Sequence, residues 1–281
     1  MKEILVTGAT GFIGQNIVPL LVELGYKPCL ITKSIKRCAE LFSNLPIEII
    51  EWDINNGPLK RNSLKKIPDT LLHLAWQDLP NYESLHHIEE NFIRNYAFIK
   101  GCVELGTSSI IVTGTCLEYG MKSGCLEVND DCTPITSYGL SKHLLHNSLL
   151  LLKSKMDFSL AWARLFYLTG EGQSANSIIP RLDRAIDKNE YEFKVSGGEQ
   201  LRDYTNVNQV AQDLSTLVVQ NSNGIFNVCS GKPISIRKLL EDRIKERRSS
   251  IVLNLGYYPY NEYEPFAFWG KPNIPKKVFN Y

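Results

Sequence analysis

The sequence predicts an α/β protein with a doubly wound parallel sheet and a smaller lobe in its C-terminal part. The first indication is a short apolar run, Ile4–Val6, that ends at a glycine triplet and is followed by the apolar stretch Ile13–Leu24. The second is the recurrence of short apolar runs, too brief for helices, which we expect to be strands: Cys29–Ile31, Ile47–Trp52, Thr70–Leu74, Ser109–Val112 and Phe158–Ala163. The third is the looser spacing and larger share of loops after Arg164. We therefore expect one α/β domain over residues 1–163 and a smaller lobe over 164–281, interleaved with the last strands of the sheet.

Composition excludes several classes of function. The 281 residues suffice for one large α/β unit, and 31 Lys and Arg nearly balance 30 Asp and Glu, so nothing predicts binding to nucleic acid or to a membrane surface. No basic segment followed by a long apolar run is present, and we expect a cytoplasmic protein. The seven cysteines are scattered without CxxC spacing, which predicts reduced thiols and no metal site.

The glycine triplet Gly8, Gly11 and Gly14 has the pattern of a dinucleotide-binding turn. Gly8 allows the tight turn after the strand, Gly11 lets the backbone approach a pyrophosphate, and Gly14 lets the helix pack on the strand. The N-terminus of the following helix offers free N–H groups and a partial positive charge. The context of strand, glycines and helix is the one that the motif requires.

The stretch TGATGFIG, with its GxxGxxG spacing, resembles the opening of the extended short-chain dehydrogenase/reductases, which include nucleotide-sugar epimerases, dehydratases and ketoreductases. The resemblance implies a Rossmann-type sheet that binds NAD or NADP. The residues that it assigns to the cofactor are Gly8, Thr10, Gly11, Phe12, Ile13, Gly14, Thr32, Lys33, Asp53, Ile54, Leu74, Ala75, Thr113, Tyr138 and Lys142. His73 in the segment LHLA is expected to be a buried, hydrogen-bonded histidine, and Asn91 resembles a family asparagine that stabilises the sheet.

The end of the second strand bears on the choice of cofactor. An acidic residue there binds the adenosine ribose hydroxyls and repels a 2′-phosphate. Here the position holds Thr32, followed by Lys33, Lys36 and Arg37. This predicts a preference for NADP(H), with NAD(H) still possible; Lys36 and Arg37 also fit an ordinary solvated helix start.

Tyr138 and Lys142 lie four residues apart, so they share one face of the predicted helix. A neighbouring ammonium stabilises a phenolate and lowers the phenol pKa, which brings tyrosine into range for proton transfer. Thr115, at the end of the preceding strand, offers a hydroxyl that holds a carbonyl oxygen. The spacing resembles that of the family, which implies that Thr115, Tyr138 and Lys142 are the catalytic residues.

The residues after Thr115 narrow the activity. Family 4,6-dehydratases carry Asp and Glu there, whereas this chain has Cys116 and Leu117, which cannot serve as that acid/base pair. Reductases related to GDP-fucose synthase carry Cys at the second position, here Leu117; we interpret Cys116 as a packed thiol that points away along the strand. Two candidate reactions are left, ketoreduction and 4-epimerisation. Thr32 and Lys33 at the end of the second strand favour the reductase, because a reductase can use NADPH.

The substrate site that the resemblance implies consists of Trp76, Thr115, Glu118, Tyr167, Ser177 and Arg202. Tyr167 stands where many family members have a substrate-binding Asn, and Arg202 belongs to an RD(F/Y) segment whose arginine pairs with the substrate diphosphate. A surface ion pair between Arg202 and Asp203 is the alternative. The leucine-rich helix Leu140–Leu152 predicts burial on two sides, against the sheet and against a second subunit, and hence a homodimer.

These observations predict an NADPH-dependent reductase whose substrate is a nucleoside-diphosphate 4-keto-6-deoxy sugar, either a hexose or a heptose. The protein resembles bacterial reductases that make precursors of surface polysaccharides, such as lipopolysaccharide O-antigen. An NAD-dependent nucleotide-sugar 4-epimerase is the alternative. A non-catalytic NADP-sensing protein is the third interpretation, which the presence of both Tyr138 and Lys142 disfavours.

Overall fold

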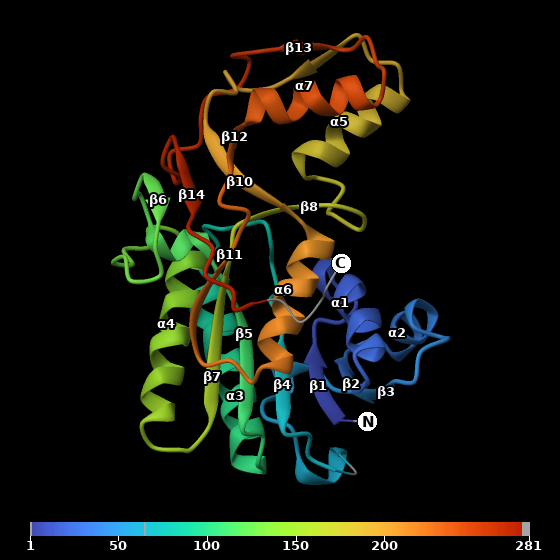
Figure 1. Ribbon diagram of the computed structural model, residues 1–281, viewed down its shortest axis with the longest axis vertical. Helices are drawn as coiled ribbons and strands as arrows, with labels where there is room; N and C mark the ends of the chain where they lie inside the picture. The colour runs from blue at the N-terminus through green and yellow to red at the C-terminus, as the bar shows by residue number, and fades with distance from the viewer. Residues whose placement is uncertain (1, 65, 277–281) are drawn as a thin grey trace.

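The computed structural model describes residues 2–64 and 66–276, so residues 277–281 of the predicted lobe lie outside it. A seven-stranded parallel sheet forms the centre of the molecule (Figure 1), with strand order β11-β7-β5-β4-β1-β2-β3. The strands are β1 (Lys2–Thr7), β2 (Tyr26–Thr32), β3 (Glu48–Glu51), β4 (Thr70–His73), β5 (Ser109–Thr115), β7 (Ser159–Leu165) and β11 (Gly224–Val228). Each predicted strand is present, and the predicted doubly wound parallel sheet is confirmed.

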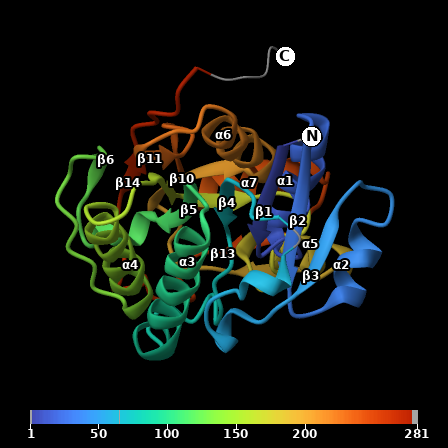
Figure 2. The same ribbon diagram turned by 90° about the horizontal axis from the view of Figure 1, so that it is seen from below.

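Helices cover both faces of this sheet, as the view from below shows (Figure 2). On one face, α1 (Phe12–Glu23) packs against α6 (Val207–Val219), with α2 (Ile35–Leu41) near the β3 edge. On the other face lie α3 (Ile93–Leu105) and α4 (Ser137–Lys153). Both layers bury apolar strand residues, since Ile4 and Val6 face one helical layer and Leu5 faces the other. The near-continuous apolar strands follow from burial on both faces.

The chain reverses its direction of progress across the sheet between β1 and β4. From β1 it proceeds outward to β2 and β3, and it returns to build β4, β5, β7 and β11 on the other side. Loops after β1 and β4 therefore diverge and leave a crevice at the carboxyl ends of the strands, which is where ligands bind in open α/β sheets.

The smaller lobe lies at the carboxyl end of the sheet, at the top of Figure 1. It contains α5 (Ile178–Asp187) and α7 (Ile236–Glu246), with short strands β8 (Tyr167–Thr169), β9 (Glu192–Lys194), β10 (Leu201–Asn206), β12 (Pro233–Ser235) and β13 (Val252–Asn254). Its own apolar core includes Leu182, Phe193 and Leu240. The predicted boundary after residue 163 falls inside β7, and β11 and α6 return to the central sheet, so the lobe and the sheet share chain segments.

Two local features differ from the sequence-based expectation. The helix expected to open at Asn91 is preceded by a π-helical segment, His87–Phe92, that contains Asn91. β5 ends at Thr115, and a 3₁₀ turn, Cys116–Tyr119, follows immediately. A pair of short parallel strands, β6 (Gly124–Leu126) and β14 (Phe268–Gly270), joins the loop after this turn to the C-terminal segment. Within the described ranges, no helix is long and apolar enough to cross a membrane.

Candidate active site

A cavity of about 280 Å³ opens at the crevice between β1 and β4. Its lining includes nine of the residues predicted for the cofactor: Gly8, Thr10, Gly11, Thr32, Lys33, Asp53, Ile54, Leu74 and Ala75. Three further predicted residues, Phe12, Ile13 and Gly14, form the first turn of α1 directly after this loop. The described structure therefore brings these predicted residues, from four segments of the chain, to one place.

The glycine loop has no room for side chains. A Cβ on Gly8 would lie 2.8 Å from the backbone nitrogen of Ala75, and one on Gly14 would lie 2.3 Å from the carbonyl oxygen of Gly8. Gly8 also has φ of +70°, which glycine adopts without strain. No side chain caps the N-terminus of α1, and its first turn holds no acidic residue. These residues fit a dinucleotide, because free N–H groups at the helix start suit a pyrophosphate.

Thr32 and Lys33, predicted to lie beside the cofactor's adenosine, are both in the cavity wall. The Thr32 hydroxyl accepts a hydrogen bond from the backbone N–H of Ser34 at 3.1 Å. Arg37 reaches back from α2 and donates to the carbonyl oxygen of Thr10 at 3.4 Å. Asp53 accepts from the backbone N–H of Asn55 at 2.9 Å. The cationic side chains of Lys33 and Arg37 and the carboxylate of Asp53 thus lie at the same end of the crevice.

Beneath the crevice, His73 is the buried, hydrogen-bonded histidine that the sequence predicted. Its Nε2 donates to Oδ1 of Asn95 at 2.7 Å, which leaves Nδ1 to accept from the Thr7 hydroxyl at 3.0 Å. Burial lowers the pKa of His73 to about 3. The sheet is thus tied to α3 through Asn95, whereas Asn91 donates to the carbonyl oxygen of Gln77.

The predicted catalytic residues converge between β5 and α4. Thr115 is the last residue of β5, and Thr136 caps α4 by accepting from the backbone N–H of Gly139 at 3.0 Å. The first turns of α4 then place Tyr138 and Lys142 on the side that faces the sheet, where both are buried.

Lys142 lies in an unusual environment for an ammonium group. Its Nζ donates to the carbonyl oxygen of Thr113 at 2.7 Å, and it lies 4.0 Å from the centroid of the Trp76 ring. Burial lowers the pKa of Lys142 to about 7, while the negative charge of Glu118 acts in the opposite direction. Thr113, predicted to contact the cofactor, is buried under the crevice and holds Lys142 through its backbone.

Tyr138 is enclosed by aromatic rings. Tyr82 stacks on it with ring centroids 5.5 Å apart, and Trp76 contacts its edge at 5.9 Å. Burial raises the pKa of Tyr138, and the Thr115 side chain beside it lowers that pKa by less. The predicted lowering of this pKa is therefore wrong for the structure described, because Lys142 lies 6.0 Å from the phenol ring and bonds the backbone instead. A phenol that keeps its proton is equipped to donate it.

Trp76, predicted to contact the substrate, lines the crevice between β1 and β4 and contacts Lys142 and Tyr138. Its indole N–H donates to Nδ1 of His87 at 3.1 Å, and the Nε2 of His87 lies 2.9 Å from the carbonyl oxygen of Asn81. His87 thus orients Trp76, which in turn covers the ammonium group of Lys142.

A second cavity, of about 580 Å³, lies between the sheet and the smaller lobe. Tyr167, Ser177 and Arg202, three of the predicted substrate contacts, line it. Its wall is rich in aromatic side chains, which include Tyr82, Tyr204, Tyr258, Tyr263 and Phe193. It also contains three cationic side chains, Arg181, Lys194 and Arg202. The size and the mixture of aromatic and cationic groups suit a nucleotide-linked ligand.

Arg202 is already engaged in this cavity. Its Nε and Nη2 donate to Oε2 of Glu264 at 3.3 and 2.8 Å, and Nη1 donates to the carbonyl oxygens of Leu201 and Phe266. Tyr167 donates to the other oxygen of Glu264. Arg202 and Glu264 are both nearly fully buried, at 6 and 7% exposure of their side chains. A diphosphate must therefore displace Glu264, or bind beside it, to reach the guanidinium.

The alternative of a surface pair between Arg202 and Asp203 is wrong, because both side chains are buried. Asp203 instead accepts from the backbone N–H groups of Ser230 at 2.8 Å and Gly231 at 2.9 Å, and from the Ser230 hydroxyl at 2.6 Å. It ties β10 to the turn after β11.

Glu118, also predicted to contact substrate, is fully buried outside both cavities. Both its oxygens are occupied by donors from Thr115, Trp162 and Arg164. Cys116 begins the 3₁₀ turn, so the alternation expected for a strand does not apply to it. It packs with Tyr138 and Phe166, and burial raises the pKa of its thiol, which makes it a packed thiol as expected.

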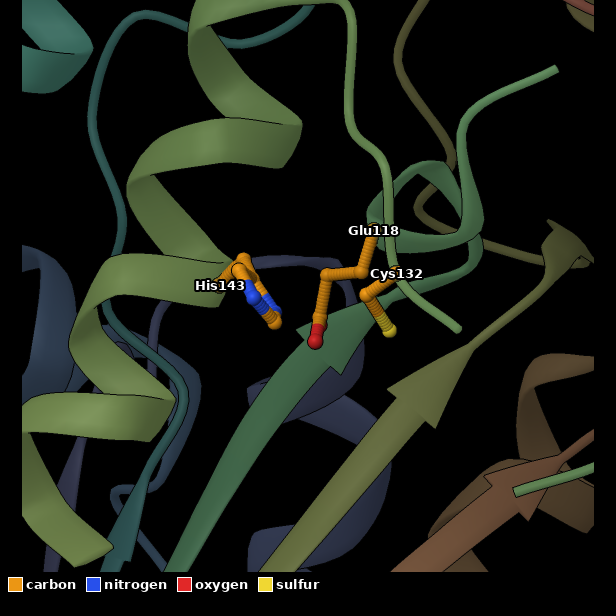
Figure 3. A group of neighbouring side chains, drawn as sticks. All are labelled: Glu118, Cys132 and His143. Atoms are coloured by element: carbon orange, nitrogen blue, oxygen red, sulfur yellow. The ribbon is translucent and has the colours of Figure 1, made fainter. Parts of the chain in front are cut away.

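Glu118 also belongs to a group that resembles a metal site. Figure 3 shows its carboxylate, the Cys132 thiol and the His143 imidazole close together, and their ligand atoms all lie within 4.8 Å of one another. However, the Arg164 guanidinium donates to Glu118 at 3.1 Å and to the sulfur of Cys132 at 3.0 Å. Two of the three groups thus already hold a cation, and like-charge repulsion disfavours a second one beside it.

Several residues of the site had no sequence signal. Tyr82, Glu264 and Lys194 come from loops or a short strand with no recognisable motif, and Arg181 lies on an otherwise ordinary amphipathic helix. The crowding of aromatic residues in Tyr257–Phe268 was the one available indication that this segment borders the pocket.

Comparisons with known proteins agree with this geometry. The sequence profile of the NAD dependent epimerase/dehydratase family matches residues 4–229. dTDP-6-deoxy-L-talose 4-dehydrogenase (NAD(+)) from Aggregatibacter actinomycetemcomitans is 31% identical over 95% of this chain and 99% of its own length. dTDP-4-dehydro-6-deoxyglucose reductase from Escherichia coli is 27% identical over 85% of this chain and 79% of its own.

Solved structures show the same fold. UDP-glucuronic acid 4-epimerase from Bacillus cereus, in complex with UDP-glucuronic acid and NAD, superposes with a TM-score of 0.84 at 21% identity, over 96% of this chain and 90% of the other. UDP-N-acetylglucosamine 4-epimerase from Methanobrevibacter ruminantium has a TM-score of 0.82 at 24% identity, over 98 and 94% of the two chains. The chain therefore belongs to the NAD dependent epimerase/dehydratase family and is an NAD(P)-dependent oxidoreductase, as the sequence predicted.

Proposed function

We propose that the protein is an NADPH-dependent reductase of the keto group of a nucleoside-diphosphate 4-keto-6-deoxy sugar. The observation that carries the proposal is the grouping of Tyr138 with Thr115 and Lys142 at the end of β5, beside the crevice that Trp76 lines. Two relatives are named for redox reactions at position 4 of dTDP-linked 6-deoxy sugars. A hexose or a heptose, destined for bacterial surface polysaccharide, is the substrate class that we infer.

In this reaction, bound NADPH supplies the hydride that adds to the carbonyl carbon. Thr115 donates its hydroxyl proton in a hydrogen bond to the carbonyl oxygen and so stabilises the charge that develops there. Tyr138 gives its proton to this oxygen, which a phenol with a raised pKa holds until an alkoxide forms. Tyr138 then takes back a proton from solvent, while Lys142, whose Nζ donates to the carbonyl oxygen of Thr113, holds α4 against β5 beside the reacting groups.

The substrate pocket supports the class of sugar. Aromatic rings of Tyr82 and Tyr167 stand on the pocket side of Tyr138, and an apolar wall favours a methyl group over a hydroxymethyl at C6. Arg181, Lys194 and Arg202 supply positive charge for the diphosphate. Ser177 at the start of α5 adds a hydroxyl that has no capping partner in its own helix.

The preference for NADPH rests on Lys33 in the crevice wall and on Arg37 beside Thr10, with the neutral Thr32 at the end of β2. A 2′-phosphate needs such cations and no carboxylate at the end of the second strand, where this chain has Thr32. The Asp53 carboxylate in the same wall acts against the preference. The name of one relative specifies NAD(+), so NADH is the competing cofactor.

The test is the oxidation of NADPH and of NADH by the purified protein with GDP-, CDP- and dTDP-4-keto-6-deoxy sugars prepared in situ by a dehydratase. Stoichiometric loss of NADPH with one of them supports the proposal and identifies the nucleotide. The second candidate is a 4-epimerase, favoured by the likeness to 4-epimerase structures. Interconversion of sugar epimers without net oxidation of the cofactor would establish it, and binding of NADP without any turnover would indicate a sensor.

A further inference from the structure

Glu118 is a charged residue at the foot of the catalytic loop, and the proposed reaction does not use it directly. It follows Thr115 by three residues, and its carboxylate is 0% exposed. Its Oε1 accepts the backbone N–H of Thr115 at 2.8 Å. In return, the Thr115 hydroxyl oxygen accepts the backbone N–H of Leu117 at 3.3 Å. These reciprocal bonds form a capping box around the 3₁₀ turn.

The carboxylate is held from the opposite side by β7, which lies beside β5 in the sheet. The indole N–H of Trp162 donates to both oxygens of Glu118, at 3.0 and 3.1 Å, and Nε of Arg164 donates to Oε2 at 3.1 Å. Arg164 is itself buried, and its other two nitrogens also have partners: Nη1 donates to the carbonyl oxygen of Val128 and Nη2 to the sulfur of Cys132. Glu118 is thus fixed by two strands and cannot relax toward solvent.

The capping box also determines how Thr115 is used. Because the hydroxyl oxygen accepts from Leu117, one of its two lone pairs is directed into the turn, and its proton is not used by the turn. The bond from the Thr115 nitrogen to Glu118 holds the backbone, and the bond from Leu117 holds the hydroxyl rotamer, so the two together place the hydroxyl. A catalytic hydroxyl must be placed to a fraction of an ångström, so such support has a direct effect on rate.

We propose that Glu118, held by its buried ion pair with Arg164, is the positioning residue that orients Thr115 for reaction with the substrate carbonyl. This inference rests on the proposed function, because it assumes that Thr115 binds a reacting oxygen. The chain uses a buried carboxylate here because three N–H donors, from Thr115, Trp162 and Arg164, converge on one point. An apolar residue would leave all three buried and unpaired.

A double-mutant cycle tests the inference through the rate. Glu118→Gln keeps the size of the side chain, but it puts an NH₂ group in the place of one acceptor. We expect kcat to fall roughly tenfold to a hundredfold, with the KM for the sugar and the Kd for NADPH nearly unchanged. In a Thr115→Val background, which already lacks the hydroxyl, the same change should alter kcat by less than about twofold. Equal losses in both backgrounds would overturn the proposal, because Glu118 would then act independently of Thr115.

Amide hydrogen exchange tests, without any substrate, whether Glu118 holds the backbone of Thr115. This part of the inference can therefore be tested even if the proposed function is wrong. We expect the Thr115 amide to exchange at least about tenfold faster in Glu118→Gln, while the amides of Ile110–Val112 in the same strand keep their protection. Unchanged protection of Thr115 would refute the inference. Glu118→Ala is the second variant, with the same readout, if Glu118→Gln does not fold.

The metal interpretation of Figure 3 provides the remaining control. Zinc content is measured on the wild-type protein after incubation with zinc sulfate, and on Cys132→Ser, which keeps an acceptor for Arg164. We expect no stoichiometric zinc in either, because Arg164 supplies the positive charge. One equivalent in the wild type that is lost in Cys132→Ser would show that the carboxylate serves a metal and would overturn the proposal.

Discussion

Lys142 gives the sharpest physical prediction, because burial moves its pKa from 10.5 to about 7. In the unfolded chain this amine keeps its proton up to its ordinary pKa, whereas the folded protein without cofactor releases it near neutrality. Between these two values the unfolded state binds more protons, so the free energy of unfolding rises with pH. The gain is at most about 1.4 kcal/mol per pH unit, or about 2 kcal/mol from pH 7 to pH 9.

The assay compares the wild type with Lys142→Met, which has a side chain of similar length and no titratable group. Urea unfolding, followed by tryptophan fluorescence at several pH values, gives both free energies; taking their difference removes the contributions of other groups. We expect the wild type to gain about 2 kcal/mol on the variant over this range. A difference that stays constant with pH would show that Lys142 keeps its ordinary pKa, and the reasoning from burial would be refuted.

Other changes have equally definite outcomes. Tyr138→Phe should lower kcat by roughly 10²–10⁴-fold and leave the Kd for NADPH, measured by fluorescence titration, unchanged; normal turnover would remove Tyr138 from the role of proton donor. Glu264→Gln removes the negative charge that occupies Arg202, so the KM for the sugar nucleotide should fall several-fold; a rise would mean that Glu264 holds Arg202 ready for the substrate. Leu151 is 67% exposed on α4, and Leu151→Glu should convert a homodimer, sized by light scattering, to a monomer; a wild-type monomer would contradict the predicted dimer.

The sheet and the cofactor loop were predictable because their signals are local. Short apolar strands, a glycine triplet before a helix, and Tyr138 four residues before Lys142 each reflect the geometry of one element. The doubly wound order then places the ends of β1 and β4 beside the same crevice. Thus most of the predicted cofactor residues line a single cavity.

The errors concern residues whose surroundings come from distant parts of the chain. The pKa of Tyr138 depends on burial under Tyr82 and Trp76, which no spacing rule reveals. Likewise, Arg202 is paired with Glu264, a residue 62 positions away in a segment without a motif. Glu118 was predicted to contact the substrate from the family resemblance, yet three donors from two strands fix it beneath the turn after β5.

The most direct test of the central claim is the transfer of deuterium from NADPH labelled at C4 of the nicotinamide. The sugar product of a reaction with a nucleoside-diphosphate 4-keto-6-deoxy sugar is analysed by mass spectrometry and NMR. We expect one deuterium on the sugar carbon that carried the keto group, with one NADPH consumed per product. Unlabelled epimers formed without net consumption of cofactor, or no reaction with any of the keto sugars, would contradict the account.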